Sequence, residues 1–190
     1  MRIIAGTAGS IPLKVPPSLT RPTADRVREA VFSVLGDRTA GARVLDLFAG
    51  SGSLGLEALS RGASEATFVE SHGPACTIIG ENLRKTLLTG ANIQRRDVFS
   101  FLATAPAGRY DLVFADPPYA RDEATLARYT ALLTLPALAA TLVPDGIFVL
   151  ESGADTALPE TPYWEIVREK TYGGTRVSYL APIPAPPFPA

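Results

Sequence analysis

The stretch Val44-Leu45-Asp46-Leu47-Phe48-Ala49-Gly50-Ser51-Gly52-Ser53-Leu54-Gly55 decides the fold of this 190-residue chain. Its apolar start predicts a buried strand, its glycines predict a tight turn, and the residues after them predict a helix that ends at Gly62. The spacing of Gly50, Gly52 and Gly55 matches the pattern in which a backbone approaches a ligand closely. A strand, a glycine turn and a helix in this order begin a βαβ unit, so the stretch predicts a parallel sheet with a ligand at the turn.

Short apolar or β-branched runs alternate with helical segments from residue 43 onward, which is typical of a parallel sheet covered by helices on both faces. Five runs are predicted to be parallel strands: Arg43–Phe48, Ala66–Glu70, Ile93–Asp97, Asp111–Asp116 and Ile147–Glu151. Two later runs, Tyr163–Arg168 and Thr175–Ala181, predict an antiparallel pair at the sheet edge. The expected fold class is therefore α/β and Rossmann-like, with a mostly parallel seven-stranded sheet.

Residues 1–38 are predicted to form an appendage to a domain that spans residues 39–181. Arg2–Ala5 and Leu13–Val15 could form a small hairpin, and a proline-marked loop leads to an amphipathic helix from about Ala24, which Thr23 or Asp25 can cap. The residues expected to face the core are Val27, Ala30, Val31, Val34 and Leu35, which leaves Arg21, Arg26 and Arg28 on the outer side. Residues 182–190 contain five prolines, so a disordered and extended tail is predicted there.

Composition and charge narrow the class of protein. No apolar run reaches the roughly 18 residues of a membrane span, and the N-terminus lacks a signal-like apolar block, so we expect a cytoplasmic protein. A single cysteine and a single histidine predict neither a disulfide nor a metal site. The net charge is −1, but five basic and two acidic side chains give residues 1–35 a charge of +3. The N-terminal segment is therefore the candidate contact for a polyanion.

The glycine turn favours a cationic cofactor over a pyrophosphate. Asp46 lies four residues before Gly50, where its carboxylate would repel phosphate but suits the ammonium and sulfonium groups of S-adenosylmethionine. Glu70, at a strand end, is placed to bind a ribose hydroxyl pair, and Asp97 to accept from the adenine amine. Val98 and Phe99 would supply a backbone N–H or an apolar wall. The expected cofactor-binding residues are Asp46, Phe48, Gly50, Ser51, Gly52, Glu70, Asp97 and Val98.

Asp116-Pro117-Pro118-Tyr119 is the candidate catalytic segment. It follows an apolar strand, so Asp116 should leave the sheet at the crevice that holds the cofactor. The prolines fix the backbone, so Asp116 and a neighbouring carbonyl can both accept from one planar NH₂ group, while Tyr119 can stack on the ring that bears the amine. Hydrogen bonds from both N–H groups of the amine would orient the nitrogen lone pair toward a methyl donor. A base can reach such a pocket only when it is unpaired or flipped out.

The glycine loop and the Asp116-Pro117-Pro118-Tyr119 segment together resemble those of class I methyltransferases. The chain resembles more closely the RsmD family of 16S rRNA guanine-N2 methyltransferases. The resemblance rests also on Arg2-Ile3-Ile4-Ala5-Gly6, on Thr20-Arg21-Pro22-Thr23 with Arg26-Val27-Arg28-Glu29, and on Leu54-Gly55-Leu56-Glu57-Ala58-Leu59-Ser60-Arg61-Gly62. It implies S-adenosylmethionine as cofactor and, as partner, 16S rRNA in the small ribosomal subunit or its assembly intermediate. The appendage would then face RNA, with Arg21, Thr23, Arg26, Arg28 and Lys14 as substrate-binding residues.

One departure from the family and several alternatives stay open. The family commonly has a basic pair where this chain has Ile11 and Pro12, and Lys14 can compensate only in part. The same amine clamp could serve adenine N6 in DNA or RNA, or a protein glutamine. The glycine spacing also fits a nicotinamide-dependent oxidoreductase. A non-catalytic RNA-binding assembly factor is a third class. We expect a monomer without metal or membrane.

Overall fold

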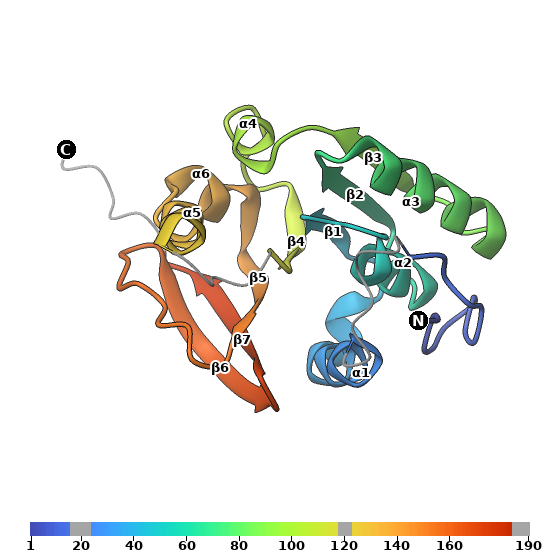
Figure 1. Ribbon diagram of the computed structural model, residues 1–190, viewed down its shortest axis with the longest axis horizontal. Helices are drawn as coiled ribbons and strands as arrows, with labels where there is room; N and C mark the ends of the chain where they lie inside the picture. Colours follow the sequence, from blue (N-terminus) through green and yellow to red (C-terminus); the bar gives the residue numbers. More distant parts are fainter. Residues whose placement is uncertain (16–23, 118–122, 184–190) are drawn as a thin grey trace.

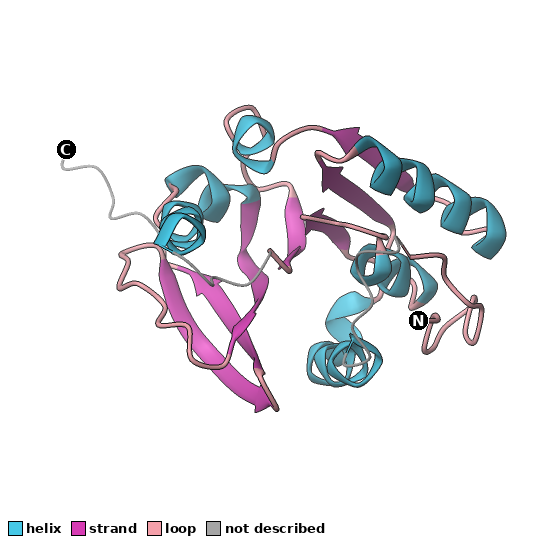
Figure 2. Cartoon of the chain, in the orientation of Figure 1, coloured by secondary structure: helices cyan, strands magenta, loops and turns pink. Residues whose placement is uncertain are grey.

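The computed structural model describes residues 1–15, 24–117 and 123–183, and its centre is a seven-stranded sheet with the order β3-β2-β1-β4-β5-β7-β6 (Figures 1 and 2). The strands are β1 (Arg43–Leu47), β2 (Glu65–Glu70), β3 (Ala91–Arg95), β4 (Tyr110–Ala115), β5 (Leu142–Gly153), β6 (Trp164–Tyr172) and β7 (Thr175–Pro182). The first five strands pair in parallel, and β7 runs antiparallel between β5 and β6. The predicted fold class is confirmed.

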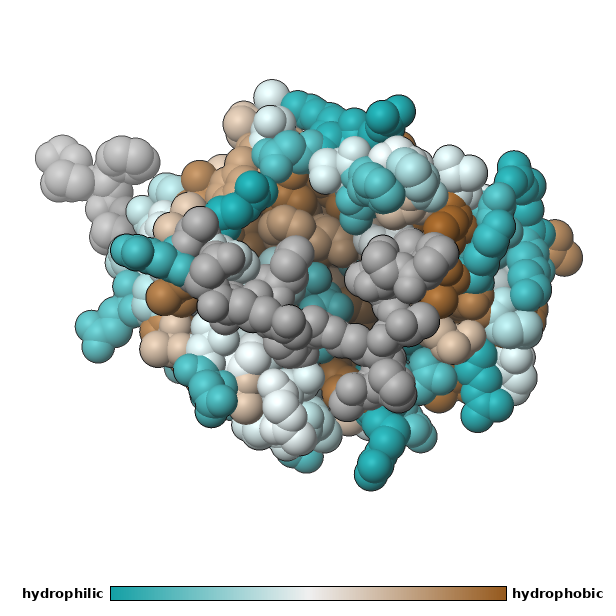
Figure 3. Space-filling model, viewed as in Figure 1, coloured by the Kyte–Doolittle hydropathy of each residue, from teal (hydrophilic) through white to brown (hydrophobic). Residues whose placement is uncertain are grey.

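Helices cover both faces of this sheet. They are α1 (Ala24–Leu35), η1 (Gly36–Thr39), α2 (Ser53–Ser60), α3 (Gly73–Thr86), α4 (Val98–Leu102), α5 (Glu123–Leu133) and α6 (Pro136–Thr141). One core cluster joins α1, α2 and α3 to the face of the sheet that carries Phe68 and Phe114, and a second joins α4, α5 and α6 to the face that carries Leu45 and Val113. In the view of Figure 3, most of the apolar residues lie inside the outline of the visible face and most of the hydrophilic residues lie along its rim.

Several predicted strand limits shift for local reasons. β3 ends at Arg95 rather than Asp97, because Asp97 is the N-cap of α4 and its side chain accepts from Ser100 N at 3.1 Å. β6 is longer than predicted because it pairs with β7 as far as Thr175. β5 is extended at both ends, at its start by pairing of Leu142 with Tyr110 of β4 and at its end by pairing with β7. β7 reaches Pro182, the first residue of the predicted tail, and residues 184–190 lie outside the described ranges.

The N-terminal segment shares its core with the sheet. Ile3 and Leu13 are buried in the same cluster as Phe114. The predicted hairpin is wrong in its extent, because residues 1–3 pair with residues 10–13 through one bridge, Arg2 to Pro12. The backbone N–H groups of Ile4 and Ala5 donate to a side chain of α2 instead.

Helix α1 forms where predicted, but its buried face is rotated. Val27, Val31 and Leu35 are buried as expected, while Ala30 and Val34 are only partly buried. Phe32 is fully buried, with its ring centroid 5.6 Å from that of Phe114, and Arg28 lies on the same side with 2% exposure. The expectation of an outward-facing Arg28 is therefore wrong. Within the described residues, no helix has the length and apolarity needed to cross a membrane.

Candidate active site

The loops after β1 and β4 meet where the sheet reverses its direction of winding. From β1 the chain moves outward to β2 and β3, whereas β4 and β5 lie on its other side. Ligands of open α/β sheets bind at the carboxyl ends of the strands at such a switch point. The register pairs Leu47 with Ala115, so Phe48 and Asp116 come directly after the ends of neighbouring strands. The predicted cofactor loop and catalytic segment are thus brought together.

The cofactor loop is built from left-handed backbone conformations and close packing. Phe48 has φ 57°, an uncommon value for a bulky side chain and one that is typical of functional turns. Gly50 and Gly52 have φ 56° and 78°. A Cβ on Gly55 would lie 2.3 Å from Cε1 of Phe68, so this glycine lets α2 rest directly on β2. The glycine spacing therefore serves helix–sheet packing as well as the exposed turn.

Asp46 is a buried carboxylate under this turn, with 2% exposure. Its Oδ2 accepts from Gly55 N at 2.9 Å. Burial raises its pKa to about 7; the hydrogen bond from Gly55 opposes this shift and the negative charge of Glu70 adds to it. A buried carboxylate beside a second acid favours a cation nearby. This property fits the cationic end of S-adenosylmethionine and does not suit a pyrophosphate.

Glu70 holds the loop from the end of β2. Its Oε2 accepts from Gly50 N at 2.9 Å, and its Oε1 accepts from His72 N at 2.7 Å. Each oxygen keeps a second lone pair for a hydroxyl donor, because a carboxylate oxygen can accept twice. The predicted ribose contact is therefore compatible with this position.

Asp97 lies beyond the end of β3, next in order along the same sheet edge. Besides capping α4, its Oδ2 lies 3.4 Å from Nη2 of Arg128, whose guanidinium also stands 5.6 Å from the ring centroid of Phe99. Val98 is buried in the second core cluster, so only its backbone is available to a ligand. Arg128, on α5, was missed because nothing in the sequence pattern links α5 to this edge.

The catalytic segment is described only in part. Asp116 is exposed directly after β4, and Pro117 is buried. Pro118 and Tyr119 lie outside the described residues, as do Arg21 and Thr23. Of the other predicted substrate contacts, Arg26 is exposed on α1 and Lys14 pairs with Glu81 at 2.7 Å.

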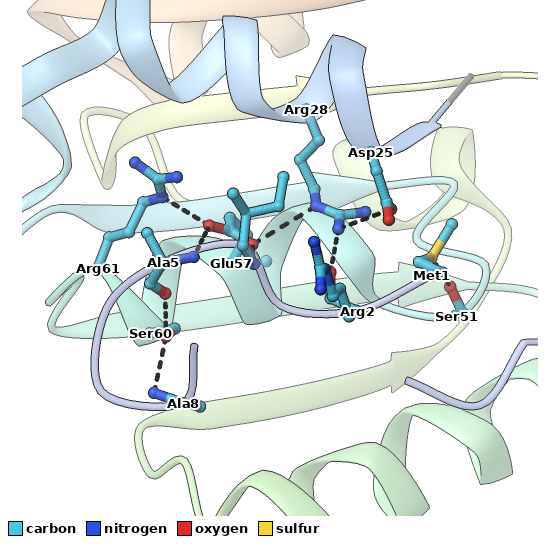
Figure 4. Close-up of polar contacts among 12 residues, drawn as sticks. Met1, Arg2, Ala5, Ala8, Asp25, Arg28, Ser51, Glu57, Ser60 and Arg61 are labelled. Carbon is cyan, nitrogen blue, oxygen red and sulfur yellow. Dashed lines mark hydrogen bonds and ion pairs between the residues drawn. The ribbon is translucent and has the colours of Figure 1, made fainter. Parts of the chain in front are cut away.

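Glu57 on α2 anchors the N-terminal segment beside this site (Figure 4). It is fully buried, and its carboxylate accepts from Ile4 N at 2.7 Å, from Ala5 N at 3.1 Å and from Arg61 Nε at 2.6 Å. Nε of Arg28 lies 3.5 Å from Glu57 Oε2, and Nη2 of Arg28 donates to Asp25. Arg28 is therefore a structural residue, which corrects its predicted substrate role.

Asn82 is a second anchor that the sequence pattern did not reveal. Its Oδ1 accepts from Lys14 N at 2.8 Å, and its Nδ2 donates to Lys14 O at 2.9 Å and to Ser51 O at 3.1 Å. Ser51 is buried, with Oγ 3.7 Å from Sδ of Met1. The cofactor loop and the basic N-terminal segment are thus joined through one amide. Among the described residues, no group of three or more metal-ligating side chains could hold an ion.

Comparison with known proteins gives a consistent set of relatives. A family model described as "Conserved hypothetical protein 95" matches residues 1–181. YlbH of Bacillus subtilis is 39% identical over 183 residues, covering 94% of this chain and 97% of that protein. "Ribosomal RNA small subunit methyltransferase D" of Escherichia coli K12 is 37% identical over 175 residues, covering 91% and 85%. The solved structure of a hypothetical protein from Thermus thermophilus superposes with TM-score 0.77 at 35% identity, covering 95% and 99%.

Proposed function

Because this chain belongs to the RsmD family, we propose that it transfers the methyl group of S-adenosylmethionine to the exocyclic N2 amine of a guanine in 16S rRNA of the small ribosomal subunit. The observation that carries the proposal is the meeting of two elements at the β1–β4 switch point: a glycine turn over buried Asp46, and Asp116 directly after β4. The first element suits a cationic methyl donor, and the second suits an amine.

The chain's own residues would hold the cofactor along the carboxyl edge of β1, β2 and β3. Asp46 and the backbone of Gly50 and Gly52 would face its cationic amino-acid end, Glu70 its ribose and Asp97 its adenine amine. When bound, S-adenosylmethionine supplies an electrophilic methyl group. Asp97 would have to share its carboxylate between the adenine and Arg128, which lies 3.4 Å away.

Asp116 would bind the amine of the substrate through hydrogen bonds. Its carboxylate and a carbonyl of the proline segment would accept the two N–H hydrogens, which orients the nitrogen lone pair and stabilises the positive charge that develops on nitrogen. A proton must leave that nitrogen during or after methyl transfer, and Asp116 or water can take it. No other general base is required by this arrangement.

A folded ribosomal particle suits the modest basic surface of the protein. Naked nucleic acid is usually held by many clustered cations, whereas the exposed basic side chains in the described part of residues 1–35 are only those of Arg2, Arg26 and the ion-paired Lys14. A particle would present the target in a fixed shape, so fewer phosphate contacts would suffice.

The test is to incubate the protein with methyl-labelled cofactor and with undermethylated free 16S rRNA, small subunits or DNA, and then to map the labelled nucleoside. We expect N2-methylguanosine in the ribosomal RNA samples only. Label in adenine, in DNA or in a protein glutamine would contradict the proposal and favour another amine substrate. Binding of the particle without any methyl transfer would indicate an assembly factor.

Two variants separate the roles of the two motifs. Asp116→Ala should lower the single-turnover rate by roughly 10²- to 10⁴-fold while leaving cofactor affinity unchanged, because Asp116 contacts the reacting amine. Glu70→Ala should weaken cofactor binding first, since it removes the acceptor for the ribose and for Gly50 N. Calorimetric titration with the cofactor measures both affinities. Equal loss of cofactor binding in the two variants would refute this division.

A further inference from the structure

Glu151 lies beside Asp116 at the carboxyl edge of the sheet. The parallel register of β4 and β5 pairs Phe114 with Val149 and Ala115 with Leu150, so Asp116 and Glu151 come next on neighbouring strands. Adjacent strands are about 4.8 Å apart. Val149 and Phe114 belong to the same core cluster, and side chains two residues apart on a strand share a face. Glu151 therefore lies on the face of the sheet that carries Phe114, at the edge where Asp116 follows β4.

The position of Glu151 is fixed from both sides. It pairs with Val177 of β7, which is fully buried in the same cluster as Val149. From the opposite face, the hydroxyl of Tyr129 on α5 donates to the backbone oxygen of Glu151 at 2.5 Å. The side chain itself is partly exposed. The backbone of Glu151 is thus held on a paired strand, beside the strand end that Asp116 follows.

We propose that Glu151 is the residue that selects guanine, by accepting the N1–H of the base while Asp116 holds its N2 amine. This inference rests on the proposed function. Guanine presents adjacent N1–H and N2–H₂ donors on its Watson–Crick edge, which two neighbouring carboxylates can accept together. Adenine presents its N6 amine beside an N1 lone pair, and a glutamine side chain presents its amide beside a carbonyl oxygen. Glu151 would face a lone pair in both cases and repel it.

The test uses 2-aminopurine, which carries the same 2-amino group as guanine but has a lone pair at N1. Small subunits reconstituted with guanine or with 2-aminopurine at the methylated position are compared by kcat/KM. The wild-type protein should prefer guanine by roughly 10- to 100-fold, the effect expected when a carboxylate that the bound base shields from water loses its hydrogen-bond donor. Glu151→Gln should bring this ratio close to one, because an amide can donate to the N1 of 2-aminopurine.

Two further variants keep the result interpretable. Glu151→Asp retains the carboxylate, so it should keep the preference for guanine even if its rate falls. Glu165→Gln removes an exposed carboxylate from β6 and should change neither rate. A guanine preference that survives in Glu151→Gln would overturn the inference, whether or not both rates fall. Absence of any guanine methylation by the wild-type protein would instead contradict the proposed function itself.

Discussion

Asp46 occupies a position in the sheet that its neighbours fill with aromatic side chains. Its register partners are Phe68 on β2 and Phe114 on β4. The acid could be recognised from the sequence, because it interrupts an apolar run just before the glycines. Its complete burial could not, since that depends on α2 closing over β1 through the contact between Gly55 and Phe68.

The raised pKa of Asp46 predicts opposite effects of pH on stability and on cofactor binding. Between about pH 4 and pH 7 the unfolded chain loses this proton while the folded protein keeps it, so the free energy of unfolding should fall as pH rises through this range. A cationic ligand prefers the ionised carboxylate. The affinity for S-adenosylmethionine should therefore rise by up to about tenfold per pH unit below pH 7 and then level off.

Equilibrium dialysis with labelled cofactor at several pH values measures this slope. Asp46→Asn is the matched control, because its amide oxygen can still accept from Gly55 N and yet does not titrate. The wild-type slope should disappear in this variant. A pH-independent affinity in the wild-type protein would contradict the assignment.

Residues with a characteristic local pattern could be predicted, whereas residues defined by long-range contacts could not. Gly50, Gly52 and Asp116 follow apolar strands, and that placement is visible in the sequence. Arg28 was misplaced because helical periodicity gives the buried face only to within about one residue, and a long basic side chain is usually exposed. Its partner Glu57 is 29 positions away and carries no local signal.

At the scale of elements, α2 supports two parts of the molecule at once. Its N-terminus follows the glycine turn, and its buried Glu57 binds the N-terminal segment and α1. The strands of the sheet were largely predictable because apolar runs separated by helices have few other arrangements. The limits of β5, β6 and the N-terminal hairpin were not, because they depend on which partner takes each backbone hydrogen bond.

Removal of the Glu57 charge should destabilise the protein strongly. Glu57→Gln should lower the free energy of unfolding by about 3 kcal/mol, because it removes the fully buried anionic partner of Arg28 and leaves that cation with Asp25 alone. Chemical denaturation measures the loss. Glu81→Gln breaks the solvent-accessible pair with Lys14 and should cost much less. Similar values for the two variants would show that the buried cluster contributes little.

Across the whole molecule, positive charge is concentrated at the N-terminal end, but less of it is available than the sequence suggests. Burial of Arg28 removes one cation from the +3 of residues 1–35, and Glu81 neutralises another at Lys14. Net charge and composition were sufficient to identify the segment. Net charge and composition could not show which cations of this segment are buried or ion-paired within the protein.

This distribution predicts how salt affects binding of the particle. Arg26→Gln combined with Lys14→Gln should weaken binding and flatten the plot of log affinity against log salt by up to about two units, about one for each phosphate that is no longer neutralised. Filter binding over a salt series measures the slope. Arg168→Gln, on exposed β6, is the control and should leave the slope unchanged. An unchanged slope in the double variant would exclude these two residues from the RNA interface.

Because Asn82 joins the cofactor loop to the N-terminal segment, we expect the two proposed binding events to depend on each other thermodynamically. The single side chain of Asn82 fixes both Lys14 and Ser51, so any ligand that orders one segment reduces the entropy cost of ordering the other. By linkage, the factor by which the RNA particle tightens cofactor binding must equal the factor by which the cofactor tightens particle binding. Such reciprocity would let the protein hold its methyl donor more tightly when the correct particle is bound. Dissociation of the methylated particle would then weaken the binding of the demethylated cofactor, which could leave as well.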